Sequence, residues 1–493
     1  MALEEMGPTY IKLGQFASTR PDLVPGNFIK ELVKLRDEVE PLPFEDIEKV
    51  FIEDWGEYWR EHFAVFSEEL LGAASIAQVY RARLKNGREV AVKVRRPGVK
   101  RQISGDLGII RFIARFIEKH FEDLKFLQPS RLAEEFSRNL FKELDYLREA
   151  LTIRKIRGNH SDLKERVLIP EVIGDISTEK ILVMEYVDGL PLEKSDLSVQ
   201  ESRDLARLGA EVLARQILRD GLFHADPHPG NLLYTFDGRL SYLDFGMVGR
   251  LSMRMRNELI DLLLAAYSNE PELILQEILI LGNVDREVDR ETLIRDIMEV
   301  SDRYLTVSLD EVSIGRALFD IFDVIRRHRI TVHPAYTVVA RAIMTAEETS
   351  RYLDRNINVL EEISPQLKKL FLKRFSPYSL WVNARILGKD LIRFANDMPS
   401  QLGQILRKLR TGQLEIEFRH MGLEEFMKTM DRVSNRISFS LVIAALIIGS
   451  SLVMHIQAGP MVMGIPALGF TGYVLAFVLG IWLLFSVIRS RKY

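Results

Sequence analysis

The sequence contains no cysteine in its 493 residues. This absence excludes disulfide bonds, thiolate nucleophiles and cysteine-ligated zinc. The net charge is −3, so no basic excess points to nucleic acid, and we expect no nucleic-acid partner. The N-terminal stretch MALEEMGPTYIKLGQ lacks the apolar run of a secretory leader, so we expect none. The chain is 47% hydrophobic and long enough for several domains with their own cores.

Charged residues are missing from two long stretches near the C-terminus. Residues 437–456 and 468–488 contain no Asp, Glu, Lys or Arg. At about 1.5 Å per residue, a helix of either length crosses a hydrocarbon core of roughly 30 Å. Basic residues lie before the first stretch and after the second, which places both outer ends in the cytoplasm by the positive-inside rule. The pattern predicts two transmembrane helices; a buried core hairpin is the alternative.

The second of these stretches carries small residues at every fourth position. Gly472, Ala476 and Gly480 fall on one face of a helix and allow another helix to approach closely. The partner helix belongs either to the same hairpin or to a second chain. A homodimer through the transmembrane helices is therefore one expectation.

The rest of the chain predicts an α+β fold with two lobes. Strand patterns at 77–84 and 88–94 flank the turn KNG, and the buried run at 180–189 predicts a further strand. Helical periodicity covers 105–121 and 130–157. We expect four parts: an N-terminal helical extension (1–66), a small β-rich lobe (67–188), a helical lobe (189–430) and the membrane hairpin (431–493).

The segment HADPHPGN, residues 224–231, carries the most chemistry. Its two histidines are four apart, as in a helical metal site, but Pro227 and Pro229 exclude a regular helix there. The spacing of Asp226 and Asn231, followed by the tripeptide Asp244-Phe245-Gly246, is typical of phosphoryl-transfer enzymes. We therefore predict Asp226 as the base or orienting group, and Asn231 and Asp244 as ligands of Mg²⁺.

Residues upstream predict a nucleotide site that faces this segment. Lys93 lies in the strand VAVKV, where its ammonium can reach the phosphates of ATP. The buried strand that ends in MEYVDG suits a hinge, so the backbone of Glu185 and Val187 could bind a purine. Ordinary kinases cover the phosphates with a glycine-rich loop, but here the loop is LGAASIAQVY, with one glycine and three alanines. We expect its members to contact the nucleotide in a stiffer arrangement; they are Ala73, Ala74 and Ser75.

In these motifs the sequence resembles the UbiB family of atypical kinases, which is linked to ubiquinone biosynthesis. The resemblance rests on KLGQ (12–15), the alanine-rich loop, VAVKV (90–94), ELDYLREA (143–150), HADPHPGN and LDFG (243–246). It implies a protein-kinase-like fold whose N-terminal extension packs over the active site.

The resemblance also implies roles for five further residues. Lys12 and Gln15 would lie over the nucleotide pocket, Lys12 would face the carboxylates of Glu143 and Asp145, and Glu149 would pair with Lys93 as a catalytic residue. Glu143 and Asp145 are two apart, so a regular helix would point them in different directions. Either the helix is irregular there or the two carboxylates do different jobs.

A basic stretch precedes the first apolar segment. Residues 365–411 contain ten Lys or Arg but only two carboxylates, with aromatic residues between them. We expect this stretch either to lie against an anionic membrane surface or to form a solvated helix face.

Together these patterns predict a membrane-anchored, ATP-binding, Mg²⁺-dependent atypical kinase or ATPase that supports isoprenoid quinone biosynthesis. We expect the bacterial inner membrane as its location, with the kinase-like domain in the cytoplasm. Expected partners are the bilayer, membrane lipids or isoprenoid quinone precursors, and other quinone-biosynthesis proteins. Two alternatives stay open: a small-molecule kinase of the aminoglycoside or choline type, and a non-catalytic nucleotide-binding scaffold.

Overall fold

The computed structural model divides the chain into two compact units, residues 1–383 and 384–493, which we describe separately. The structure describes all residues except 1, 19, 21–23, 25, 33–34, 36–38, 269, 284–287, 306–312, 356, 358–361, 363–422, 457–459, 463–464 and 490–493. The predicted basic stretch at 365–411 lies outside the described residues.

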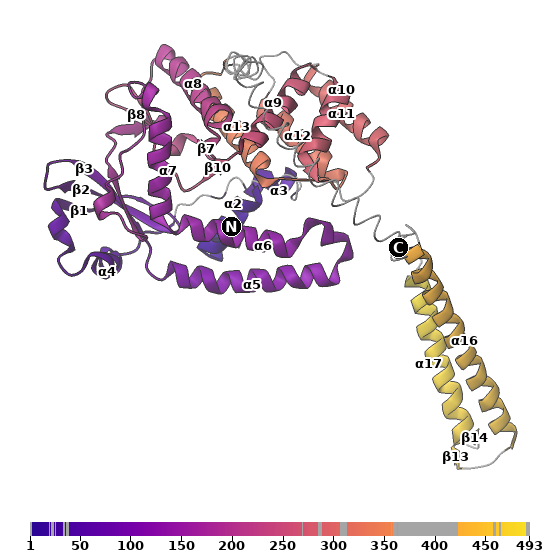
Figure 1. The fold of residues 1–493 in the computed structure, drawn as a ribbon. Coiled ribbons are helices and arrows are strands. Elements are labelled where there is room, and N and C mark those ends of the chain that lie inside the picture. The colour runs from indigo at the N-terminus through magenta and orange to yellow at the C-terminus, as the bar shows by residue number, and fades with distance from the viewer. Residues whose placement is uncertain are drawn as a thin grey trace, which may run out of the picture. The chain divides into compact units, whose positions relative to one another are not determined.

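The first unit begins with short helices and a four-stranded antiparallel sheet (Figure 1). The helices are α1 (Ala2–Glu5), α2 (Pro8–Ser18), α3 (Gly26–Leu32) and α4 (Phe44–Trp55). The strands follow the order β1 (Phe63–Ala73), β2 (Ala77–Leu84), β3 (Glu89–Arg95) and β5 (Ile181–Glu185). Gly87 adopts a left-handed φ of 87° in the turn between β2 and β3, so the predicted hairpin is present. The strand β1 begins at Phe63, inside the segment that we expected to be helical.

Aromatic residues from α4 and the segment after it cover one face of this sheet. Phe51 stacks on Trp59 with ring centroids 4.6 Å apart, and both are buried against Tyr80 and Val92 of the strands. Rings of this size bury large apolar areas, so they anchor the N-terminal extension to the sheet. The opposite face packs against α7 (Tyr146–Asn159) and joins a second core that continues into the helical lobe.

The predicted helix at 130–157 is wrong in one respect, because two helices replace it. The first, α6 (Pro129–Glu143), lies beside α5 (Val99–His120), and the second is α7. The chain leaves the helix at Leu144, whose carbonyl accepts a hydrogen bond from Arg95 at 2.7 Å. The next helix starts with the N–H of Tyr146 donating to the carbonyl of Glu179 at 3.1 Å. The carbonyl of Leu144 and the N–H of Tyr146 therefore bond outside the helix and cannot belong to a continuous one. Of the two alternatives given for Glu143 and Asp145, the irregular helix is present.

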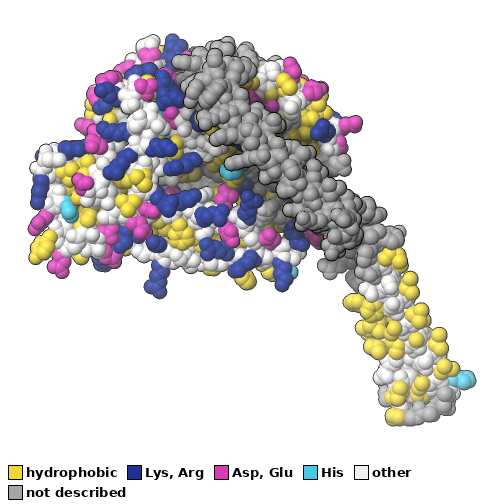
Figure 2. Space-filling model, viewed as in Figure 1, with side chains coloured by type: hydrophobic (Ala, Val, Ile, Leu, Met, Phe, Trp, Pro, Cys, Tyr) yellow, Lys and Arg dark blue, Asp and Glu magenta, His cyan; other side chains and the backbone are white. Residues whose placement is uncertain are grey.

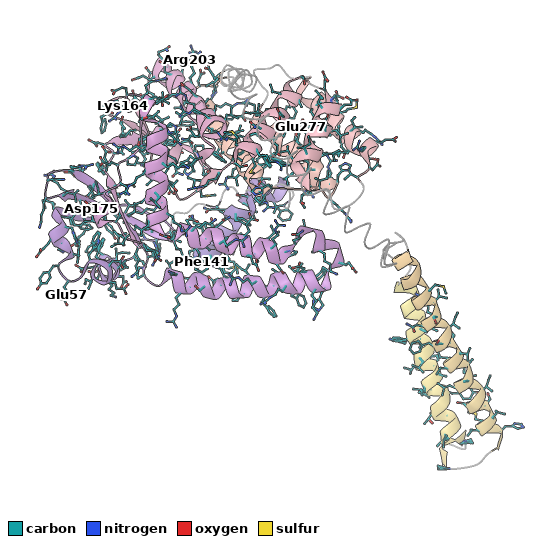
Figure 3. All side chains as sticks on the ribbon, viewed as in Figure 1. Glu57, Phe141, Lys164, Asp175, Arg203 and Glu277 are labelled. Atoms are coloured by element: carbon teal, nitrogen blue, oxygen red, sulfur yellow. The ribbon has the colours of Figure 1, made fainter. Side chains whose placement is uncertain are left out.

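The helices α5 and α6 share a small apolar core of their own. Its buried members include Ile103 and Leu107 of α5 and Phe136 and Leu140 of α6. Phe141, labelled in Figure 3, packs at the edge of this core. Helix α2 also contacts both α5 and α6, so the N-terminal extension rests on this pair.

The helical lobe contains short strands that shape the predicted catalytic loop. A second four-stranded sheet has the order β4 (Val167–Leu168), β9 (Leu240–Tyr242), β8 (Leu232–Thr235) and β6 (Gly189–Pro191). A separate two-stranded sheet pairs β7 (Leu222–His224) with β10 (Val248–Arg250). The turn between β8 and β9 contains Gly238 with φ of 86°. Because β7 enters the loop 224–231 and β10 follows Asp244-Phe245-Gly246, their pairing holds the two motifs together.

Helices build the remainder of this lobe around the largest apolar core. They are α8 (Val199–Ala214), α9 (Met253–Ser268), α10 (Pro271–Leu281), α11 (Arg290–Leu305), α12 (Ile314–Arg327) and α13 (Pro334–Leu353). The strands β11 (Gly282–Asn283) and β12 (Thr331–Val332) pair between them. Helix α13 is packed against α8 and α12 and reaches the predicted catalytic loop.

The second unit contains a helical hairpin formed by α16 (Leu423–Ile456) and α17 (Ala467–Arg489). The strands β13 (Met461–Val462) and β14 (Ile465–Pro466) pair at its tip. In α16, residues 433–455 are long and apolar enough to cross a membrane and are almost wholly exposed. The described apolar run of α17, residues 467–483, is shorter. Within the hairpin, Ala476 is buried and Gly472 faces the Ser450 side chain closely, whereas nothing lies within 4 Å of an added Cβ at Gly480.

Gly189 offers a test of the second sheet, because the backbone of β8 approaches it closely. A Cβ at this position would lie 2.6 Å from the carbonyl oxygen of Tyr234 and 2.8 Å from the Cα of Thr235. Backbone cannot move aside as a side chain can, so Gly189→Ala should lower the free energy of unfolding by about 1–3 kcal/mol. Gly72→Ala is the matched control, since nothing lies within 4 Å of its added Cβ. Chemical denaturation of both variants measures the difference, and equal stabilities would contradict the close approach of β6 and β8.

Candidate functional site

Lys93 lies between two carboxylates that come from different parts of the chain. Its Nζ donates to Oε1 and Oε2 of Glu149 at 2.8 and 3.0 Å, and to Oδ1 of Asp244 at 3.2 Å. Lys93 is carried by β3, Glu149 by α7, and Asp244 by the segment between β9 and β10. The ion pair between Lys93 and Glu149 that the resemblance implied is therefore present in the structure.

These contacts fix the charges of the site. Burial disfavours the charge of Lys93, yet Asp244 and Glu149 raise its pKa well above the usual value. Burial also opposes ionisation of Asp244, but the ammonium of Lys93 and the N–H of Gly246 hold the pKa of Asp244 well below its usual range. Although protein atoms lie close around Asp244, half of its side-chain surface is exposed to solvent. The site therefore keeps a charged ammonium and an accessible carboxylate at neutral pH.

His224 is a structural residue that connects the two predicted motifs. Its Nδ1 accepts the N–H of Asp226 at 3.2 Å, and its Nε2 bonds the carbonyl oxygen of Asp244. Burial lowers the pKa of His224, which agrees with a neutral ring whose Nε2–H donates to that carbonyl. The backbone N–H of His224 donates in turn to Gln216 at 2.9 Å. Both imidazole nitrogens are thus occupied, so the histidine is no metal ligand.

Asp226 and Asn231 lie on one loop, and a hydrogen bond joins them. The side-chain amide of Asn231 donates to the carbonyl of Asp226 at 3.2 Å. This bond uses the nitrogen of Asn231 and leaves its side-chain oxygen as an acceptor.

The residues present fit Mg²⁺ bound together with a nucleotide. Both hydrogen bonds to Asp244 reach Oδ1, and no partner of Oδ2 is found among the described residues. The oxygens of Asp244 and Asn231 are hard donors of the kind that Mg²⁺ prefers, and Mg²⁺ usually completes its shell with phosphate oxygens and water. In the described parts of the chain, no cluster of three or more His, Asp or Glu could hold a metal by itself. A cation here would therefore depend on a bound phosphate.

Lys12 of α2 forms a buried ion pair with Glu143 at the end of α6. This is one of the two carboxylates that the resemblance placed opposite it. The other carboxylate, Asp145, accepts a hydrogen bond at its Oδ2 from Nε of Arg148 at 2.9 Å. The helix break between α6 and α7 explains the difference, because it lets Glu143 and Glu149 face two different lysines.

The structure also shows a site residue that the sequence did not suggest. Arg341 of α13 is buried and pairs with Oδ2 of Asp226 at 3.3 Å. It donates as well to the carbonyl of Gln15 at 3.2 Å and to Oγ of Ser18 at 2.7 Å. Two turns along α13, Thr349 donates to the carbonyl of Pro227 at 3.0 Å. One helix thus holds the loop of Asp226 and the C-terminal end of α2 at the same time.

Some of the backbone groups that we predicted to contact the nucleotide already form hydrogen bonds within the protein. The turn that contains Ala73, Ala74 and Ser75 is closed by the N–H of Ala74 donating to the carbonyl of Ala77 at 2.8 Å. At the hinge, the N–H of Glu185 donates to the carbonyl of Glu171 at 2.8 Å. In the described chain no backbone hydrogen bond of Val187 is found. The hinge can therefore offer the carbonyl of Glu185 and the N–H of Val187 to a purine. In the alanine-rich loop, by contrast, the N–H of Ala74 is already used by a hydrogen bond within the protein.

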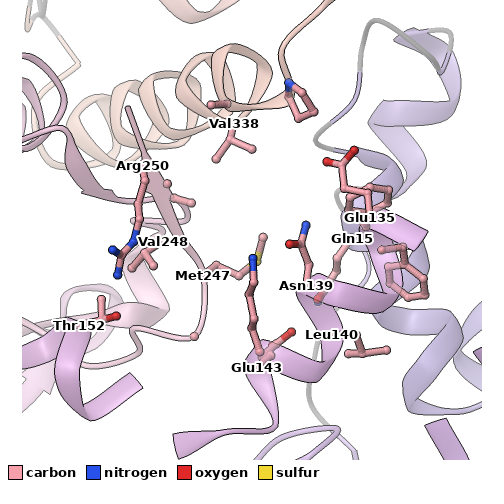
Figure 4. A pocket seen from close by; sticks show the side chains of 18 of the residues that line it. Gln15, Glu135, Asn139, Leu140, Glu143, Thr152, Met247, Val248, Arg250 and Val338 are labelled. Carbon is pink, nitrogen blue, oxygen red and sulfur yellow. The ribbon is translucent and has the colours of Figure 1, made fainter. Parts of the chain in front are cut away.

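A cavity of about 700 Å³ opens beside the catalytic loop (Figure 4). Its walls come from α2, α6, α7, the segment 245–250 and the start of α13. Lys12, Gln15, Glu143 and Glu149 line it, and so does Ala225, next to Asp226. Figure 4 shows Gln15 and Asn139 on one side, Val248 and Arg250 on the other, and Val338 across the opening. Apolar wall residues alternate with charged ones, so the cavity suits an amphipathic molecule.

Models of known protein families match most of the chain. The ABC1 atypical kinase-like domain matches residues 34–278, the UbiB helical domain matches 297–358, and the ABC1/UbiB kinase-like C-terminal domain matches 421–489. A Clostridium pasteurianum protein from the 5′ region of hydrogenase 1 is 33% identical over 99% of this chain and 92% of its own length. An Arabidopsis thaliana chloroplastic aarF domain-containing protein kinase, At1g71810, is 34% identical over 82% of this chain and 58% of its own length.

A solved structure has the same fold. Rv3197 from Mycobacterium tuberculosis, determined in complex with erythromycin, superimposes with a TM-score of 0.51 at 24% identity. The match covers 73% of this chain and 93% of that one. The predicted fold class, protein-kinase-like α+β with two lobes and a C-terminal helical hairpin, is confirmed.

The bridge through Arg341 predicts that α2 and Asp226 are coupled. Arg341→Met keeps the length of the side chain but removes every donor to Asp226, Gln15 and Ser18. Hydrogen bonds to charged groups contribute about 1.5–3 kcal/mol, so amide hydrogen exchange in α2 should accelerate by roughly 10- to 100-fold. Arg351→Met is the control, since it makes the same change about 15 Å further along the same helix. Unchanged exchange in α2 of Arg341→Met would show that the bridge does not hold the helix.

Proposed function

The chain belongs to the ABC1/UbiB family of atypical kinase-like proteins, and from this premise we propose that it is an ATP-binding, Mg²⁺-dependent atypical kinase or ATPase. In this proposal it is anchored in a membrane and supports isoprenoid quinone biosynthesis. The observation that carries the proposal is the position of Lys93 between Glu149 and Asp244. That arrangement leaves one ammonium charge and one accessible carboxylate at the place where phosphoryl transfer needs them.

Each residue of the site has a task in this proposal. Lys93 orients the phosphates of ATP, and Glu149 keeps the ammonium in place. Asp244 and Asn231 would hold Mg²⁺, which supplies positive charge to the phosphate oxygens when it is bound. Asp226 orients the attacking hydroxyl or water, and Arg341 fixes the carboxylate of Asp226 for that role. The hinge carbonyl of Glu185 and the N–H of Val187 would bind the purine.

The cavity beside the loop supports a small amphipathic partner rather than a protein substrate. Helix α2 forms one wall of the cavity through Lys12, Gln15 and Phe16, and Ala225 of the loop 224–231 also lines the cavity. A membrane lipid or an isoprenoid quinone precursor has the apolar body and polar head that such a cavity suits. The apolar helix α16 supports location in a membrane, and the bacterial inner membrane, with the kinase-like unit in the cytoplasm, is the location we propose.

ATP hydrolysis by the purified full chain tests the proposal. Wild type, Asp244→Asn and Asp175→Asn should be compared with and without anionic liposomes. Losing the carboxylate of Asp244 should lower turnover by at least about 100-fold, as expected when a charge that stabilises a transition state is removed. Asp175 is exposed and has no hydrogen bond or ion pair in the described structure, so Asp175→Asn should match wild type. Lipid-stimulated turnover would connect the chemistry to the membrane.

Other outcomes separate the alternatives. Equal turnover in Asp244→Asn and wild type would refute the assignment of the site. Stoichiometric phosphorylation of a soluble alcohol would favour a small-molecule kinase. If Asp244→Asn abolished hydrolysis but left the quinone content of the host unchanged, a scaffold that binds nucleotide would be favoured instead.

A further inference from the structure

Helix α5 has two apolar faces, of which only one is used inside the protein. Ile103, Leu107 and Ala114 are buried, and the first two belong to the core shared with α6. At about 100° per residue these three residues lie within one narrow sector of the helix. This face explains how α5 is held in the unit.

The second face points away from the protein. Ile109, Phe112, Ile113 and Phe116 are 49–65% exposed and fall within an arc of about 100° opposite the buried face. Two more exposed apolar residues, Phe121 and Leu124, follow the helix. In Figure 2 hydrophobic, basic and some acidic side chains mix along the lower edge, where Figure 1 places α5 and α6. We call the four residues of α5 the apolar stripe.

Basic side chains border the apolar stripe along one edge. Arg101, Arg115 and Lys119 are exposed along its border, and among the described residues none of them forms an ion pair. The two acidic residues of α5 are engaged elsewhere. Asp106 accepts a hydrogen bond from Thr9, and Glu118 accepts the backbone N–H of Ser130 at 3.2 Å. The stripe is therefore an apolar band with a positive margin.

We propose that the apolar stripe of α5 binds the surface of an anionic lipid bilayer. An amphipathic helix with aromatic and branched side chains on one face and basic residues beside them is the pattern of an interfacial helix. The inference rests on the membrane anchoring in the proposed function, because α16 keeps a bilayer at high effective concentration near the unit. A second copy of the chain suits the face less well, since two positive margins would be brought together.

This docking would bring the cavity close to lipid. Helix α6 packs directly on α5, and its residues Glu135, Phe136, Asn139, Leu140 and Glu143 line the cavity. A helix layer is about 8–10 Å thick. With α5 against the bilayer and α6 behind it, the cavity would lie two helix layers, about 16–20 Å, from the bilayer surface.

Cysteine labelling of the full chain in liposomes tests this surface. Because the chain has no cysteine, a single substitution gives one labelled site. An environment-sensitive fluorophore would be attached at Phe112→Cys on the stripe, at Phe236→Cys and at Ile448→Cys. Phe236 is 72% exposed in the turn between β8 and β9 and serves as the matched control, while Ile448 is 61% exposed on α16 and reports membrane insertion. The vesicles contain phosphatidylcholine with or without phosphatidylglycerol, plus nitroxide-labelled lipid as quencher.

We expect the nitroxide lipid to quench the probe at Phe112→Cys, but not at Phe236→Cys, in vesicles that contain phosphatidylglycerol. Adding Arg115→Gln and Lys119→Gln should weaken docking by about fivefold for each charge removed. Phe112 is exposed, so thermal unfolding of the labelled protein should match wild type and exclude misfolding as the cause.

Three results would overturn the proposal. One is equal quenching of the probes at positions 112 and 236 while the probe at 448 is quenched. Another is docking that is the same with and without phosphatidylglycerol. The third is self-quenching between probes at position 112 that depends on protein density and not on lipid, which would assign the stripe to a second copy. A probe at 448 that is not quenched would instead refute the membrane anchoring on which the inference rests.

Discussion

The ammonium of Lys93 is shared by two carboxylates that the fold brings from distant parts of the chain. Glu149 is 56 residues away in sequence and Asp244 is 151 residues away. Removing Lys93 would leave two carboxylates without their cation, and an uncompensated buried charge costs about 3–5 kcal/mol. The small sheet, α7 and the segment after β9 must therefore keep one relative arrangement. The remaining features of the site are built around this constraint.

The break between α6 and α7 follows from this constraint on Lys93 and its two carboxylates. A continuous helix would separate Glu143 and Glu149 by about 120° around its axis, whereas both line the same cavity in the structure. Arg95 and the carbonyl of Glu179 take the backbone groups on either side of Asp145, so α7 starts in a new direction. As a result, Glu143 at the end of α6 pairs with Lys12 of the N-terminal extension, and Glu149 in the first turn of α7 pairs with Lys93 of the sheet. The same two helices then form adjacent walls of the cavity.

The sequence predicted those parts of the molecule that short-range patterns encode. The hairpin around Gly87, the buried strand at 181–185 and the order of the lobes all depend on local spacing. The motifs singled out Lys93 and Asp244, the family resemblance singled out Glu149, and the structure brings the three side chains together. Periodicity could not reveal the helix break, because its cause lies in Arg95 and Glu179, which are far away in sequence. Arg341 was missed for the same reason: it is one of two arginines in α13, lies 115 residues after Asp226 and belongs to no motif.

Arg341 changes how the N-terminal extension should be understood. If α2 were only a cover, its contacts with the helical lobe would be independent of the loop that carries Asp226. Instead one buried guanidinium holds the last turn of α2 and the carboxylate of Asp226 together. Moving α2 outward would remove a donor from Asp226, and loosening the loop would release α2. Opening the cavity and disturbing Asp226 are therefore coupled, so the wall formed by α2 and the loop that carries Asp226 act as one element.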